Sequence, residues 1–133
     1  MIGIEDIQTA AHRIGSHVRR TPVIDATQLK SPLGDAEVSL KLELLQVTGS
    51  FKARGATNRL LAMDKADLAR GVVTASGGNH GIATARAAWM AGVPATIFLP
   101  SNASPAMALG NSPYFLRNAS TKALLAGLLW LKW

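Results

Sequence analysis

Two stretches decide how this chain is interpreted: Thr48-Gly49-Ser50-Phe51-Lys52-Ala53-Arg54-Gly55-Ala56, and the later loop Ser76-Gly77-Gly78-Asn79-His80-Gly81. In the first, a glycine turn precedes a predicted helix that Ser50 is placed to cap, so Lys52 would lie in the first helical turn. The second joins a predicted strand to a predicted helix and leaves backbone N–H groups free at the start of that helix. An activated lysine amine near such a loop is typical of a site for an aldehyde cofactor.

The residues around the loop predict a strand, a helix and a second strand. Gly71 to Ala75 and Ala95 to Leu99 are short apolar runs, and the alanine-rich segment from Asn79 to Ala91 between them is helical in character. Gly92-Val93-Pro94 would end this helix. These lengths predict a right-handed parallel crossover and an α/β fold. The loop from Ser76 to Gly81 would lie at the carboxyl end of a strand, where ligands bind in open parallel sheets.

The first 50 residues carry weaker patterns. Apolar residues from Ile4 to Val18 recur at helical spacing and predict a helix of about four turns, which the Arg19-Arg20-Thr21-Pro22 segment would end. Val23-Ile24 is expected to be extended, and Ser31 to Asp35 to form a turn. Val38 to Glu43 alternates apolar and polar residues, which predicts a half-buried strand.

Composition excludes several classes of function. With 133 residues, 48% of them apolar, the chain has the size of one globular domain. It has no cysteine, and its three histidines lack zinc-type spacing, so no metal site is expected. We find neither a secretory signal nor an apolar run of about 18 residues, so we expect a cytoplasmic protein without a membrane partner. The net charge is +6, but the basic residues are scattered, and no nucleic-acid partner is expected.

The glycines around Asn79 do not match the dinucleotide-binding pattern G-x-G-x-x-G, and no stretch matches the phosphate-binding pattern G-x-x-x-x-G-K-[ST]. Instead, the two motifs, in which Asn79 follows Lys52 by 27 positions, resemble those of the pyridoxal-phosphate threonine/serine dehydratases. The resemblance extends from about Ile4 to Ala106. It implies an α/β fold with a partial three-layer open parallel sheet, the Rossmann-like small domain of the tryptophan synthase β-like fold, truncated at its C-terminus.

The resemblance assigns roles residue by residue. Lys52 resembles the catalytic lysine that bonds covalently to the aldehyde of pyridoxal 5'-phosphate and then moves the substrate's α-proton. Phe51 resembles a residue beside the cofactor ring, and Asn79 resembles the asparagine that binds the ring hydroxyl. The loop that would hold the carboxylate of a small amino-acid substrate comprises Ser76, Gly77, Gly78, Asn79 and His80.

The implied reaction is the β-elimination of threonine or serine to a 2-oxo acid and ammonia. Relatives that racemise serine place a second serine at the position of Gly77, as acid or base for the opposite ring face. Glycine has no proton to give, so elimination is favoured over racemisation. A serine racemase, a threonine synthase or a hydroxyectoine-pathway dehydratase remains an alternative within the same class.

The resemblance ends near Ala106, where Met107 replaces the family's usual lysine. We therefore expect two parts: residues 1–106, the N-terminal part of a catalytic domain, and residues 107–133, a divergent tail. The apolar run from Ala123 to Trp133 could be a core helix, an adhesive end or the translation of a shifted frame, and we favour the last. The phosphate-binding loop would lie beyond the chain, which predicts a weakly active or inactive form. The alternative is a non-catalytic fragment that forms homo-oligomers or associates with other chains through the tail.

Overall fold

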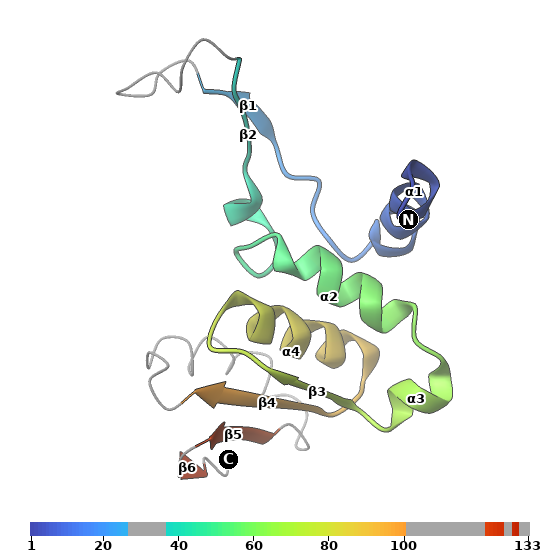
Figure 1. Ribbon diagram of the computed structural model, residues 1–133, viewed down its shortest axis with the longest axis vertical. Coiled ribbons are helices and arrows are strands. Elements are labelled where there is room, and N and C mark those ends of the chain that lie inside the picture. The colour runs from blue at the N-terminus through green and yellow to red at the C-terminus, as the bar shows by residue number, and fades with distance from the viewer. Residues whose placement is uncertain (27–36, 101–121, 127–128, 131–133) are drawn as a thin grey trace.

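The computed structural model describes residues 1–26, 37–100, 122–126 and 129–130, and it has a mixed α/β architecture (Figure 1). The expected turn from Ser31 to Asp35 lies outside the described residues. The helices are α1 (Ile4–Ile14), α2 (Lys52–Leu61), α3 (Lys65–Ala69) and α4 (Asn79–Ala91), with a 3-10 turn η1 (Glu43–Leu45). The strands are β1 (Val23–Asp25), β2 (Ser39–Lys41), β3 (Val72–Ala75), β4 (Ala95–Pro100), β5 (Lys122–Ala126) and β6 (Leu129–Trp130).

The larger sheet has the order β3-β4-β5-β6. β3, β4 and β5 are parallel, with Val72 opposite Ala95 at the start of β3, whereas β6 runs antiparallel to β5. Along β4, buried side chains alternate with partly exposed ones, and Ile97 is completely buried. The predicted strand, helix and parallel strand are therefore confirmed, and they place the Asn79 loop at the carboxyl end of β3.

Small side chains allow close packing between the two central helices. α4 covers one face of the sheet, and α2 packs on the other side of α4 (Figure 1). The main apolar cluster is rich in alanine, whose small side chain lets neighbouring helix backbones approach each other closely. Its members come from α2, α4 and β4: Ala56, Leu60, Ala83, Ala87, Ala88 and Ala95.

Two glycines fix the ends of this unit. Gly92 adopts a left-handed conformation, with φ of 68°, and ends α4, as the sequence predicted. Gly71 precedes β3 with φ of 85°, and a Cβ built there would lie only 2.7 Å from the carbonyl oxygen of Pro94. Any other residue would meet both backbone strain and a collision with Pro94.

Two sequence expectations about local structure are wrong. α1 has 11 residues and ends at Ile14, ahead of the segment from Arg19 to Pro22 that was expected to end it. Ser50 does not cap α2: the helix begins at Lys52 with Phe51 as its N-cap, and the buried Ser50 hydroxyl has no hydrogen-bond partner among the described residues. In the tail, for which a core helix was one alternative, the described segments are the strands β5 and β6.

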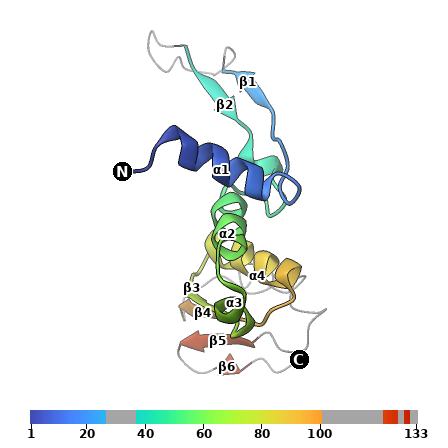
Figure 2. The same cartoon turned by 90° about the vertical axis from the view of Figure 1, so that its right-hand side faces the viewer.

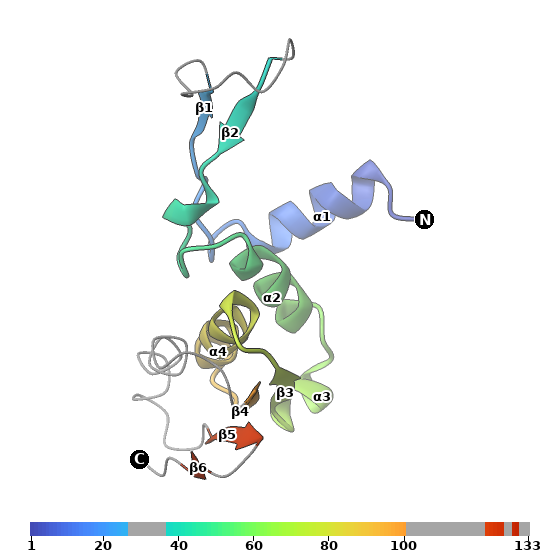
Figure 3. The ribbon, with the colours of Figure 1, turned by 60° about the vertical axis from the view of Figure 1, so that its left-hand side comes forward.

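The strand predicted from Val38 to Glu43 is shorter and more exposed than expected. It is reduced to β2, which pairs antiparallel with β1, and all six residues of the two strands are exposed. Both turned views show this hairpin extending away from α2 and the larger sheet, and no other described element covers either of its faces (Figures 2 and 3). The alternation of apolar and polar residues in this segment therefore does not mark a buried face of the strand.

Within the described ranges, no helix is both long and apolar enough to cross a membrane. The same ranges contain no group of three or more acidic, histidine or cysteine side chains arranged to hold a metal ion.

Candidate active site

Lys52 is the first residue of α2, and its side chain faces an open groove of about 530 Å³. The groove lies between α2, β3 and the first turns of α4. On α2 its lining recurs every three or four residues, as expected for one face of a helix. These α2 residues are Lys52, Gly55, Ala56, Arg59 and Leu60.

His80 lines the same groove from the first turn of α4. Its Nε2 lies 3.0 Å from the hydroxyl oxygen of Thr74, near the end of β3, and Thr74 also lines the groove. The structure thus brings together Lys52 and His80, which are 28 positions apart in the sequence. The sequence analysis did not assign a role to Thr74, although its position six residues before His80, just across the loop, could have indicated it.

The hydroxyl of Ser76 organises the loop from within. Its Oγ accepts hydrogen bonds from the backbone N–H groups of Gly78, at 3.2 Å, and Gly81, at 3.0 Å. The N–H groups of Gly77, Asn79 and His80 have no acceptor among the described residues. Three unused N–H groups at the start of a 13-residue helix form a favourable place for an anion, because the helix dipole adds to their partial charge.

The other predicted residues of the loop do not line the groove, whereas Phe51 does. Asn79 and Gly77 are exposed, and Gly78 is half-buried in an extended conformation. The groove lining does not include Ser76, Gly77, Gly78 or Asn79. Phe51 does line it, and its ring centroid lies 4.8 Å from Lys52 Nζ, a cation–π distance.

The charged side chains among the described residues that line the groove are basic and not acidic. Lys52, Arg59 and His80 contribute basic side chains, and no acidic residue is among the described lining residues. Arg59, which the sequence analysis did not single out, lies two helical turns beyond Lys52 on the same face. Such a surface favours a ligand that carries negative charge.

The family model described as "Pyridoxal-phosphate dependent enzyme" matches residues 14–113. The chain therefore belongs to this family of pyridoxal-phosphate-dependent enzymes.

Among the relatives, a serine racemase of Oryza sativa subsp. indica is 42% identical over 81% of this chain and 31% of its own length. An L-threonine ammonia-lyase of Thermotoga maritima is 44% identical over 75% of this chain and 25% of its own length. The structure of maize serine racemase superposes with a TM-score of 0.80 at 36% identity, over 94% of this chain and 37% of that one. The chain thus spans about a third of the length of the curated relatives it matches. These likenesses also confirm the expected fold class, which is tryptophan synthase β-like.

The groove and loop fit pyridoxal phosphate at its reactive end. The family's cofactor carries an aldehyde, which an exposed primary amine such as that of Lys52 can attack. A Cβ built at Gly55 or Gly78 would contact nothing within 4 Å, so there is open space at these two positions, on the groove wall and in the loop. The unused N–H groups at the start of α4 lie at the same end of β3 as His80 and suit a carboxylate.

Proposed function

We propose that this chain carries the lysine and the substrate-carboxylate loop of an enzyme that eliminates the β-hydroxyl of threonine or serine. The products would be a 2-oxo acid and ammonia. The observation that carries the proposal is the shared groove, which Lys52 and His80 line from two different helices. The relatives named above include both an ammonia-lyase and a racemase, so the choice of reaction depends on the loop residues of this chain.

In this proposal Lys52 holds the cofactor through a covalent bond to its aldehyde, beside the ring of Phe51, while Asn79 binds the ring hydroxyl. Pyridoxal phosphate, when bound, supplies the electron sink that weakens bonds at the substrate's Cα. The amine of Lys52, once displaced by the amine of the substrate, would take the proton from Cα. Its position on the groove wall supports this role, because a base must lie within hydrogen-bond reach of the proton it removes.

The carboxylate of the substrate would bind at the N-terminus of α4. The unused N–H groups of Gly77, Asn79 and His80 would donate to its oxygens, and Ser76 would hold the loop in shape through its bonds to Gly78 and Gly81. In this arrangement the Thr74 hydroxyl fixes the orientation of the His80 ring on the groove wall. These residues would orient the substrate so that its Cα–H bond faces Lys52.

Gly77 supports elimination over racemisation. Racemisation requires a second acid or base on the face opposite Lys52, and a glycine at this exposed position of the loop supplies none. We therefore propose dehydration and deamination as the main reaction, with threonine or serine as substrate.

The test of this assignment is a chimera in which residues 1–106 replace the matching segment of the Thermotoga maritima L-threonine ammonia-lyase. We expect the chimera to release 2-oxobutanoate from threonine.

Two variants of the chimera sharpen this test. Lys52→Ala should abolish release of 2-oxobutanoate, whereas the matched control Lys65→Ala, in the exposed helix α3, should leave it unchanged. Gly77→Ser should increase the yield of D-serine from L-serine relative to pyruvate. An active Lys52→Ala chimera would refute the assignment of the catalytic lysine.

Association with other chains is a second candidate function, supported by exposed apolar side chains. Ile4 and Ile7 on α1 are 67% and 57% exposed, Leu44 is 68% exposed, and Val73 on β3 is 72% exposed. Ile4 and Ile7 lie three residues apart on one helix, and exposed apolar side chains that adjoin in this way are candidates for an interface. Gel filtration of the chain, alone and with a full-length dehydratase, tests for a complex. Elution as a monomer in both runs would exclude this function.

A further inference from the structure

We propose that a polar clamp, formed by Thr21, Glu43 and Arg54, positions Lys52 by holding the first turn of α2 from the side opposite the groove. This inference rests on the proposed function, in which Lys52 is the reactive amine. The clamp residues do not line the groove, so they would act on the reaction through α2 alone.

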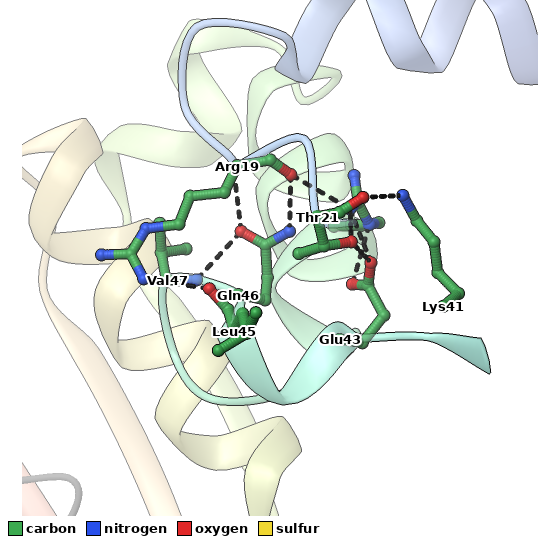
Figure 4. Close-up of polar contacts among 8 residues, drawn as sticks. Arg19, Thr21, Lys41, Glu43, Leu45, Gln46 and Val47 are labelled. Carbon is green, nitrogen blue, oxygen red and sulfur yellow. Dashed lines mark hydrogen bonds and ion pairs between the residues drawn. The ribbon is translucent and has the colours of Figure 1, made fainter. Parts of the chain in front are cut away.

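The centre of the clamp is a two-pronged ion pair. Arg54 donates from Nε to one carboxylate oxygen of Glu43, at 2.9 Å, and from NH2 to the other, at 2.7 Å. The Thr21 hydroxyl donates to the same carboxylate at 2.5 Å (Figure 4). Thr21 is 4% exposed, and the Glu43 and Arg54 side chains are 17% and 32% exposed. A paired, forked contact in this partly buried setting fixes orientation as well as distance.

Helix geometry places the clamp and the groove on opposite sides of α2. Arg54 follows Lys52 by two residues, a rotation of about 200° around the helix axis. Lys52 therefore faces the groove while Arg54 faces the clamp. No side chain caps the helix start: Phe51 provides no cap, and the Ser50 hydroxyl has no hydrogen-bond partner in the described part of the chain. Burial of Ser50 and Ala53 and the polar contacts of Arg54 hold this turn.

The clamp is itself anchored to two connecting segments. The Gln46 side chain, which is 2% exposed, accepts from the N–H of Arg19 and donates to its carbonyl oxygen, at 2.8 and 2.9 Å. Arg54 NH2 also donates to that carbonyl, at 3.1 Å, and Lys41 Nζ donates to the Thr21 carbonyl, at 2.7 Å. Figure 4 shows these contacts converging between the two segments. Arg54 thus ties α2 to both the segment after α1 and the segment after β2.

The Glu43 carboxylate stays ionised at neutral pH. Hydrogen bonding to Arg54, followed by hydrogen bonding to Thr21, lowers the pKa of Glu43 from its ordinary value of 4.5 to about 2, against the opposing effect of burial. The clamp is therefore charged and intact at neutral pH.

The test compares Glu43→Gln, Arg54→Gln and the double variant with a matched set at the exposed ion pair of Asp67, on α3, and Arg70, just after it, which lie 2.6 Å apart. All variants are studied as the full chain, under conditions where circular dichroism shows them folded. The first readout is amide hydrogen exchange at Arg54 and Ala56. The second is the share of label at Lys52 after treatment with pyridoxal phosphate and borohydride.

We expect Glu43→Gln to accelerate exchange at these two amides about tenfold, which is the usual effect of losing a charged hydrogen bond. Exchange in the middle of α4 should not change. The Lys52 share of the label should fall several-fold, and the double variant should be no worse than Arg54→Gln, because the two side chains act through each other. Asp67→Asn should change neither readout.

The two proposals fail in different ways. Label spread evenly over the lysines of the unsubstituted chain overturns the assignment of Lys52. The clamp is overturned if exchange at Arg54 and Ala56 in Glu43→Gln equals that in Asp67→Asn. It is also overturned if the α2 amides change while the share of label at Lys52 stays constant, since the clamp would then have only a structural role.

Discussion

The unit formed by β3, α4 and β4 and the region around the β1–β2 hairpin are held together in opposite ways. In the first, buried apolar side chains such as Ile97 and the alanines of α4 make the contacts. In the second, both strands are exposed, and polar side chains around Glu43 join the hairpin to the rest of the chain. α2 belongs to both regions, since Leu60 packs on α4 while Arg54 enters the clamp. The proposed catalytic lysine therefore lies where a well-packed core meets a polar junction.

Ile97→Ala should give the largest loss of stability. The side chain is fully buried in the central strand of the larger sheet, and truncation of such a residue costs about 2–5 kcal/mol. Leu40→Ala in the exposed hairpin is the matched control and should cost less than about 0.5 kcal/mol. Urea unfolding of both variants measures the difference. Equal losses of stability in the two variants would show that the hairpin packs on apolar surface, contrary to the exposure of its strands.

Gly71→Ala should rank next, with a loss of about 2 kcal/mol. Alanine would be forced into a positive φ, and its Cβ would collide with the Pro94 carbonyl. Gly55→Ala, at a helical position with open space, should be neutral or stabilising by up to about 1 kcal/mol. Thermal unfolding of the two variants separates these outcomes. A neutral Gly71→Ala would contradict the close approach of the two backbone segments.

The polar junction should also respond to acid in a way that the core does not. Because the pKa of Glu43 is lower in the folded chain than its ordinary value, its contribution to stability is complete above about pH 4.5 and is lost as the pH falls toward about 2. Glu43→Gln should remove this part of the acid dependence and destabilise the chain by about 1–3 kcal/mol at pH 7. Unfolding curves at pH 7, 4 and 3 measure both effects. A stability difference that does not narrow toward pH 3 would contradict the assignment.

The smallest effect is expected at the exposed ion pair of α3. Arg70→Gln removes a bond of 2.6 Å to Asp67, but the two side chains are 78% and 53% exposed, and pairs of this kind contribute about 0–0.5 kcal/mol. Added salt screens exposed charges, so it should make even this loss of stability too small to detect. A loss as large as that of Glu43→Gln would mean that exposure does not distinguish the two ion pairs.

The sequence alone predicted the structure of the first region well and that of the second region poorly. β3, α4 and β4 were predictable because apolar runs, Gly92 and Pro94 set them locally. The clamp was not, because Thr21, Glu43 and Arg54 are far apart in sequence and no periodicity connects them. Ser50 was misassigned as a cap because propensity favours serine there, whereas Phe51 is the N-cap and the Ser50 hydroxyl is buried without a partner among the described residues.

Within the site, Lys52, Phe51 and the loop from Ser76 to His80 were identified by motif alone. The meeting of Lys52 and His80 in one groove needed the structure, and so did Thr74 and Arg59. The roles assigned to Lys52, Phe51, Asn79 and the other loop residues stay predictions.

The most direct measurement compares two lysines, one from each region. Lys52 faces the groove, whereas Lys41 donates to the Thr21 carbonyl at 2.7 Å. After treatment with pyridoxal phosphate at neutral pH, borohydride reduction and peptide mapping, we expect most of the label at Lys52 and little at Lys41 or Lys65. Equal labelling of Lys52 and these two lysines would contradict the central claim that the amine at the start of α2 is the one that binds the cofactor.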